Sequence, residues 1–167
     1  GYYKALGDEI LLKTDYGGLD AFDRVFISKV FTDTPVPEAA LKLSNVSYGG
    51  TGFFYDKAPA LPEAVEHQMP DYHLYDGWVS AQLAAGKRRQ EFSYYTDYSI
   101  GFLTRGCFRK CAFCVNQNYD RVRLHSPLSE FVDSSRKKIC LLDDNFFGCP
   151  DWRRLLAELQ ATGRPFQ

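Results

Sequence analysis

The sequence predicts an α/β protein in which a small parallel sheet is followed by the first β/α units of a second sheet. Two observations indicate this fold. In both halves of the chain, short apolar segments rich in β-branched and aromatic residues alternate with helix-forming segments, and between the halves this regularity fades. Strands that alternate with helices are typical of parallel sheets. We expect a first domain at 1–75, a linker at 76–97 and a second domain at 98–167.

The first half contains three strand candidates and one helix. The apolar run 9–13 is the first candidate, 24–31 is a longer one with the composition of a buried strand, and 45–48 is the third. A proline in the first turn favours a short helix over 37–43. Parallel sheets bind ligands at the carboxyl ends of their strands, which is where the glycine-rich stretch 49–52 falls.

The second half resumes the alternation. A strand is expected over 99–104, then a helix with Ser126 as N-cap and a proline at its first position. A strand over 138–142 precedes a helix from Pro150 whose apolar residues recur on one face. Two such units suit the beginning of a barrel or of an open parallel sheet. Residues 164–167 look like the start of a further strand, so we expect the chain to be a piece of a longer protein.

Composition excludes several classes of protein. The chain has 167 residues, 20 basic and 21 acidic side chains and a formal charge of −1, with 45% hydrophobic and 25% charged residues. These values exclude a disordered chain, a fibrous repeat and a nucleic-acid binder recognisable from net charge. No apolar run approaches the ~18 residues of a membrane helix, and the first residues carry no apolar signal region. We therefore expect a soluble protein of the cytoplasm.

Three of the five cysteines lie within eight residues, directly after a predicted strand. Cys107, Cys111 and Cys114 have the spacing C-x₃-C-x₂-C. In a cytosolic protein such a cluster indicates a metal site rather than disulfides. A structural zinc wants four protein ligands, and iron–sulfur clusters usually take four cysteines. Three thiolates in one loop would leave one iron of a cluster open to a substrate or cofactor.

The stretch GFLTRGCFRKCAFC, residues 101–114, resembles the signature of the radical S-adenosylmethionine (SAM) superfamily, C-x₃-C-x-aromatic-C. The resemblance implies that Cys107, Cys111 and Cys114 hold a 4Fe–4S cluster and that SAM chelates the fourth iron. An electron from flavodoxin or ferredoxin would cleave SAM to a 5′-deoxyadenosyl radical. Phe113 would pack beside the adenine. The SAM amino group would meet the polar residues after the second barrel strand: Asp143, Asp144 and Asn145. Alternatively, one of these aspartates caps or turns the chain.

The first half resembles the cobalamin-binding, Rossmann-like domain that precedes the radical SAM barrel in one branch of the superfamily. The matching features are Ser28 at a strand end, Gly49 and Gly50 after a later strand, and the connector 69–74. The cobalt-ligating D-x-H-x-x-G loop is absent, and none of the three histidines stands in its context, so we expect no bound cobalamin. The whole protein would then be a Rossmann-like domain followed by a partial (β/α)₆ TIM-like barrel.

Several alternatives stay open. The chain could be a non-catalytic zinc- or iron–sulfur-binding module, and as a fragment it is expected to be inactive, with no catalytic side chain assigned. Cys140 is expected to be buried, and a fourth ligand from Cys149 would contradict the open-iron site. The substrate is unknown, with RNA or a protein as candidates. Cations near the motif and nearby tyrosines could contact RNA or form a solvated face: Arg105, Arg109, Lys110, Arg121, Arg123, Tyr94, Tyr95, Tyr98 and Tyr119.

Overall fold

The computed structural model describes residues 1–167 and shows a mixed α/β protein with three two-stranded sheets. The chain forms two compact units. The larger unit comprises residues 1–12, 62–109 and 119–167, and the smaller unit comprises 13–61 and 110–118. None of the helices is both long and apolar enough to cross a bilayer. The α/β class is therefore confirmed, while the structure shows no closed barrel.

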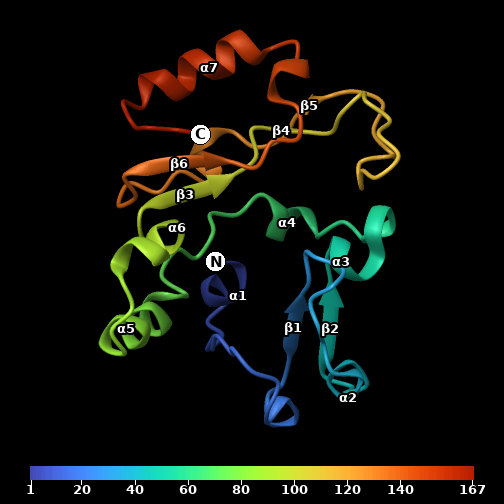
Figure 1. Ribbon diagram of the computed structural model, residues 1–167, viewed down its shortest axis with the longest axis vertical. Coiled ribbons are helices and arrows are strands. Elements are labelled where there is room, and N and C mark those ends of the chain that lie inside the picture. The colour runs from blue at the N-terminus through green and yellow to red at the C-terminus, as the bar shows by residue number, and fades with distance from the viewer. The chain divides into compact units, whose positions relative to one another are not determined.

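The smaller unit is built on two parallel strands. β1 (Val25–Ser28) pairs with β2 (Val46–Gly49) so that Ser28 lies opposite Gly49, and α2 (Glu38–Leu41) connects them (Figure 1). Both strands and the helix are confirmed: β1 and α2 are shorter than the predicted 24–31 and 37–43, and β2 is shifted by one residue from the predicted 45–48. Three short helical segments complete this unit: η1 (Leu19–Ala21), α3 (Thr51–Phe54) and η2 (Tyr55–Lys57).

Two expectations for the first half are wrong. The strand predicted over 24–31 is not buried: its side chains alternate between partly buried and exposed, and Phe26 is 58% exposed. The alternation shows that β1 is covered on one face only, whereas a central parallel strand is buried by helices on both faces. The run 9–13 forms no strand, and Ile10 and Leu11 are 39% and 64% exposed. No strand of the three sheets pairs with this run, and β1 pairs with β2 alone.

The larger unit contains a β/α/β arrangement. β3 (Tyr98–Gly101) and β6 (Lys138–Leu141) are parallel, and α7 (Trp152–Ala161) follows β6 and lies across the sheet (Figure 1). After α7 the chain returns beside β6: the Ile139 N–H donates to the Pro165 carbonyl at 3.0 Å, and the Leu141 N–H to the Gln167 carbonyl at 2.9 Å. The predicted strands, the last helix and the start of a further strand are thus confirmed.

The core of the larger unit lies between α7 and the sheet. Leu155 and Leu159 of α7 are 4% and 1% exposed and belong to the same buried cluster as Ile139 of β6, which is fully buried. The predicted i, i+3, i+4, i+7 pattern thus places the apolar face of α7 on the sheet. The buried cluster consists of Leu103, Val122, Phe131, Ile139, Cys149, Leu155 and Leu159.

The crossover from β3 to β6 does not contain the predicted helix. Only a 3₁₀ turn forms there, η4 (Leu128–Glu130), and Ser126 makes no cap hydrogen bond to it. The chain turns away soon after this, because the carboxylate of Asp133 accepts the N–H of Ser135 at 2.7 Å and competes with helical hydrogen bonds. The crossover instead contains a short antiparallel pair, β4 (Thr104–Arg105) with β5 (Arg123–Leu124).

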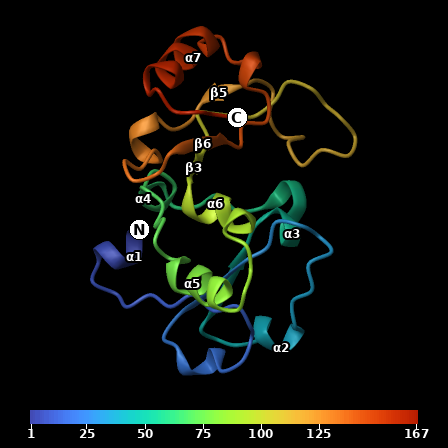
Figure 2. The ribbon, with the colours of Figure 1, turned by 60° about the vertical axis from the view of Figure 1, so that its left-hand side comes forward.

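The expected linker 76–97 is largely helical and lies in the larger unit, close to the start of β3 (Figure 2). It contains α5 (Asp76–Ala84) and α6 (Ser93–Thr96). This unit also holds α1 (Tyr2–Ala5), α4 (Glu63–Glu66), η3 (Arg89–Phe92) and η5 (Phe146–Gly148).

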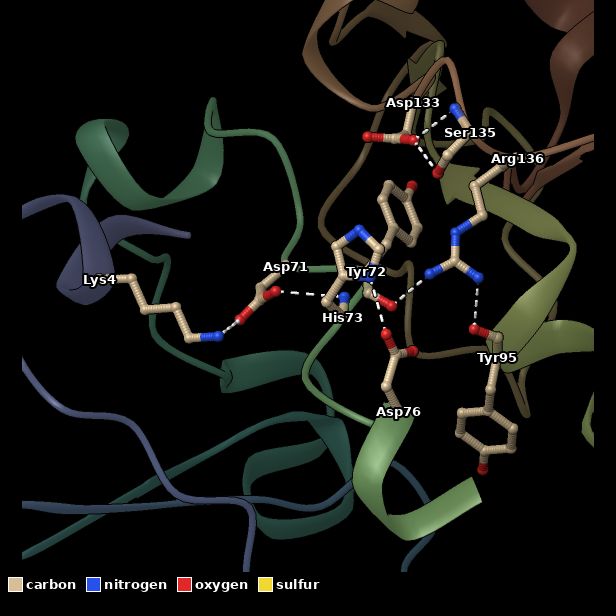
Figure 3. A network of polar contacts seen from close by, with 9 residues as sticks. All are labelled: Lys4, Asp71, Tyr72, His73, Asp76, Tyr95, Asp133, Ser135 and Arg136. Atoms are coloured by element: carbon tan, nitrogen blue, oxygen red, sulfur yellow. Dashed lines mark hydrogen bonds and ion pairs between the residues drawn. The ribbon is translucent and has the colours of Figure 1, made fainter. Parts of the chain in front are cut away.

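One buried arginine fastens this segment to β6. Arg136 is 5% exposed and donates from Nη1 to the carbonyl of Tyr95 at 2.7 Å and from Nη2 to the carbonyl of Tyr72 (Figure 3). Its guanidinium also lies over the Tyr72 ring, 5.2 Å from the centroid. One carbonyl comes from the turn at Tyr72 and the other from α6, so one side chain holds both segments at the amino-terminal end of β6.

Candidate metal and cofactor site

The turn that leads into the cysteine motif depends on a glycine. Gly106 has φ +95°, a conformation that side chains other than glycine rarely adopt. A Cβ at this position would also collide with the carbonyl of Arg121 and the ring of Tyr119. The chain can therefore turn from β4 directly into Cys107 because position 106 carries no side chain.

Asp143, which follows β6, is hydrogen-bonded to the start of β4 and to the residue before it. Its carboxylate accepts the N–H of Leu103 at 2.9 Å, the N–H of Thr104 at 2.8 Å and the hydroxyl of Thr104 at 2.6 Å. Burial raises the pKa of this carboxyl above its ordinary value, although the three donors oppose the shift. Both oxygens are occupied by the chain itself, so Asp143 acts as the structural cap that sequence analysis left open.

The next two residues contact the motif more loosely. Asp144 is exposed, and its carboxylate accepts the N–H of Gly106 at 3.3 Å. The side-chain amide of Asn145 lies 3.6 Å from the sulfur of Cys107. Of the three predicted SAM-binding residues, Asp144 thus keeps the most accessible carboxylate, and Asn145 points toward a predicted metal ligand.

Backbone and amide N–H groups are directed at two of the motif's sulfurs. The sulfur of Cys107 accepts the N–H of Arg109 at 3.4 Å, and the sulfur of Cys114 accepts the N–H of Asn116 at 3.4 Å. The side-chain amide of Gln117 donates to the carbonyls of Cys111 and Cys114, which gives the loop its curvature. Hydrogen bonds to cysteine sulfur are among the features by which proteins tune iron–sulfur clusters.

Tyr55 supports the later part of the motif within the smaller unit. Its hydroxyl donates to the carbonyl of Phe113 at 2.8 Å, and the amide of Asn118 donates to the carbonyl of Asp56 at 2.8 Å. Tyr55 is also the only non-glycine residue with positive φ, at 52°. Sequence analysis missed this contact, since nothing in the pattern near residue 55 points to residue 113. The Phe113 side chain itself is 85% exposed.

The donor chemistry of the motif fits a cluster, although the structure does not gather the ligands. All five cysteines are free. No group of three or more His, Cys, Asp or Glu side chains lies close enough together to hold a metal ion. Cys140 is buried as predicted, at 8% exposure, and Cys149 is 2% exposed within the apolar core. The three accessible thiols are therefore those of Cys107, Cys111 and Cys114, which are each partly exposed.

A charged cluster lies beside β4 in the larger unit. The carboxylate of Glu66 accepts hydrogen bonds from Nε2 of His125 at 3.0 Å and from Nη2 of Arg105 at 3.3 Å. The carboxylate of Glu130 lies 2.7 Å from Nδ1 of His67. The side chain of His125 is 19% exposed. Burial lowers the pKa of His125, whereas the hydrogen bond to Glu130 raises the pKa of His67. Arg105, two residues before Cys107, is therefore already in a salt bridge with Glu66.

The tyrosines and cations proposed as an RNA contact do not form one surface. Tyr94 and Tyr98 stack on each other at the amino-terminal end of β3, with centroids 4.8 Å apart. Tyr95 instead packs against Trp78. The predicted cations belong to β4, β5 and the cysteine loop, beyond the carboxyl end of β3. Tyr119, by contrast, lies beside Gly106 and close to these cations, so the four tyrosines are divided between the two ends of β3.

Of the features that resemble a cobalamin-binding domain, Ser28, Gly49 and Gly50 lie together at the carboxyl ends of β1 and β2, while the connector 69–74 belongs to the larger unit. Ser28 and Gly49 are register partners, and Gly50 follows with φ +102°. A Cβ at Gly50 would collide with the Lys29 carbonyl, so this glycine allows the two backbones to approach closely.

Comparison with models of known protein families, with curated proteins and with solved structures gives no match to this chain.

Proposed function

We propose that the chain is part of a radical SAM enzyme in which Cys107, Cys111 and Cys114 ligate a 4Fe–4S cluster. The observation that carries the proposal is the C-x₃-C-x-F-C signature at the turn after β3 and β4, on three free and partly exposed thiols. Two of these sulfurs already accept N–H groups. When bound, the reduced cluster supplies the electron that cleaves the C5′–S bond of SAM to methionine and a 5′-deoxyadenosyl radical.

The residues after β6 have separate tasks in this proposal. Asp143 holds the ends of β3, β4 and β6 together and does not meet the cofactor, because its oxygens are occupied by Leu103 and Thr104. Asp144 accepts the ammonium of SAM, since its carboxylate is exposed and makes one long hydrogen bond. Asn145 orients the thiolate of Cys107. The exposed ring of Phe113 packs beside the adenine.

The rest of the protein follows from the same proposal. The larger unit would be the beginning of a partial (β/α)₆ barrel, and the smaller unit a Rossmann-like domain that binds no cobalamin. Flavodoxin or ferredoxin would supply the electron, and RNA or a protein is the substrate class. A cytoplasmic location suits five free thiols, since that compartment keeps cysteines reduced.

Metal content after anaerobic reconstitution tests the ligand set. The wild-type chain should take up about four irons and four sulfides. Cys107→Ser, Cys111→Ser and Cys114→Ser should each lose most of this iron, while Cys140→Ala, which removes a buried thiol outside the motif, should retain it. A colourless protein with stoichiometric zinc would overturn the proposal in favour of a non-catalytic zinc module.

A further inference from the structure

A polar cleft opens at the amino-terminal ends of β3 and β6, away from the cysteine motif. Its volume is about 460 Å³, and it is lined by Arg89, Gln90, Ser93, Asp97 and Lys138. Tyr98 and Lys138 are the first residues of their strands, whereas the motif and Asp143 follow the carboxyl ends of β3 and β6. No residue of this cleft has a task in the proposed function.

This region carries a surplus of positive charge on a chain that is slightly acidic overall. Segments 87–98 and 137–138 contain five cations, against the carboxylates of Glu91 and Asp97, while the whole chain has a net charge of −1. Glu91 pairs with Arg88 at 3.0 Å, and Asp97 lies 3.8 Å from Arg89. Lys138 contacts no carboxylate in a salt bridge; its ammonium lies 5.2 Å from the centre of the Tyr98 ring. The five cations are Lys87, Arg88, Arg89, Lys137 and Lys138.

An aromatic surface adjoins the cleft. Tyr94 and Tyr98 stack with their planes 19° apart, and Tyr94 is 51% exposed. Gln167 donates to the Tyr94 hydroxyl at 2.8 Å and holds the ring in place. A smaller hollow of about 130 Å³ continues from Lys138 along Tyr98, Phe166 and Gln167. Arg89 and Lys138 thus line the cleft, Tyr98 lines the hollow that adjoins it at Lys138, and Tyr94 stacks on Tyr98.

We propose that this cleft binds single-stranded nucleic acid, with phosphates on Arg89 and Lys138 and a base stacked on Tyr94. Single strands are bound where a positive groove tracks the backbone and aromatic rings stack the bases. The cleft is open and polar rather than enclosed and apolar, which suits a passing strand better than a free small molecule. Asp97 helps by holding the guanidinium of Arg89 at the cleft.

Fluorescence anisotropy with a labelled oligouridine of about ten nucleotides tests this inference on the iron-free protein. Tyr94→Leu should weaken binding about 5- to 150-fold. Arg89→Gln and Lys138→Gln should each reduce the slope of log affinity against log salt by about 0.7. The control is Lys42→Gln, since Lys42 is a 75% exposed lysine of the smaller unit. Thermal melting equal to that of the wild type shows that each variant is folded.

The outcomes are distinct. Loss of binding in the three cleft variants, but not in the control, supports the inference. Absence of binding at low salt, or equal affinity for Lys138→Gln and Lys42→Gln, overturns it. Free UMP that competes as strongly as the oligonucleotide would show a mononucleotide site and overturn the strand assignment. Because no metal is required, failure here leaves the proposed function untouched, and failure of the iron-binding test leaves this inference untouched.

Discussion

Replacing Asp143 with alanine should destabilise the larger unit far more than the same change at Asp144. The carboxylate of Asp143 accepts the N–H groups of Leu103 and Thr104, and these residues are 1% and 0% exposed. A buried donor left without a partner costs about 1–3 kcal/mol. Two such donors would cost about 2–6 kcal/mol, and relief from burying the carboxylate, shown by its raised pKa, offsets part of this. We expect a net loss of about 3 kcal/mol.

Urea unfolding followed by circular dichroism measures this difference at constant pH. The matched variant Asp144→Ala removes one long hydrogen bond from an exposed carboxylate and should change the free energy of unfolding by less than about 0.5 kcal/mol. Thr104→Val removes only the hydroxyl contact to Asp143 and should cost about 1 kcal/mol. If Asp143→Ala costs no more than Asp144→Ala, the cap assigned to Asp143 is wrong.

Two further predictions concern the packing around β3. Tyr72→Phe should lower the free energy of unfolding by about 1–3 kcal/mol, because its hydroxyl accepts the N–H of Ile100 at 2.8 Å and donates to the carbonyl of Phe131 at 2.7 Å; an unchanged urea midpoint would refute this. Burial lowers the pKa of His125 in the folded protein below the ordinary value of 6.5. The folded state therefore favours the neutral ring, and the stability that this ring contributes is present above pH 6.5 and is lost as pH falls through the folded pKa. His125→Gln should therefore flatten the loss of stability as pH falls below about 6.5, and nuclear magnetic resonance titration of the ring should give a pKa below 6.5.

The sequence predicts elements well where one pattern is satisfied locally. The helix from residue 152 is predicted because its leucines recur at helical spacing, and the structure buries Leu155 and Leu159. The strands of both parallel pairs are predicted because β-branched and aromatic residues gather in them. Cys140 is predicted to be buried because it lies within an apolar strand, and its 8% exposure confirms this.

The errors arise where contacts between distant residues decide the structure. The apolar run 9–13 reads as a strand but finds no partner. The helix predicted from Ser126 stops after one turn, because local hydrogen bonds of Asp133 redirect the chain. Segment 76–97 is predicted as a linker because the charged run Lys87–Arg89 interrupts its pattern, yet Arg136, from far along the chain, connects it to the larger unit through the carbonyl of Tyr95. No local signal predicts such long-range contacts.

The candidate site divides in the same way. The spacing of the cysteines is a local signal, so sequence analysis could name the three thiols. The roles of the residues after β6 could not be separated, because only the folded chain shows that Asp143 is occupied by Leu103 and Thr104 while Asp144 is exposed. The hydrogen bond from Tyr55 to the carbonyl of Phe113 joins residues 58 positions apart, and no sequence motif predicts it.

The most direct test of the radical SAM assignment is electron paramagnetic resonance of the reconstituted, reduced protein with and without SAM. We expect the signal of a reduced 4Fe–4S cluster that changes when SAM is added, and a weaker response to SAM in Asp144→Ala at unchanged iron content. A cluster whose spectrum is the same with and without SAM would contradict the open iron site and, with it, the radical SAM assignment.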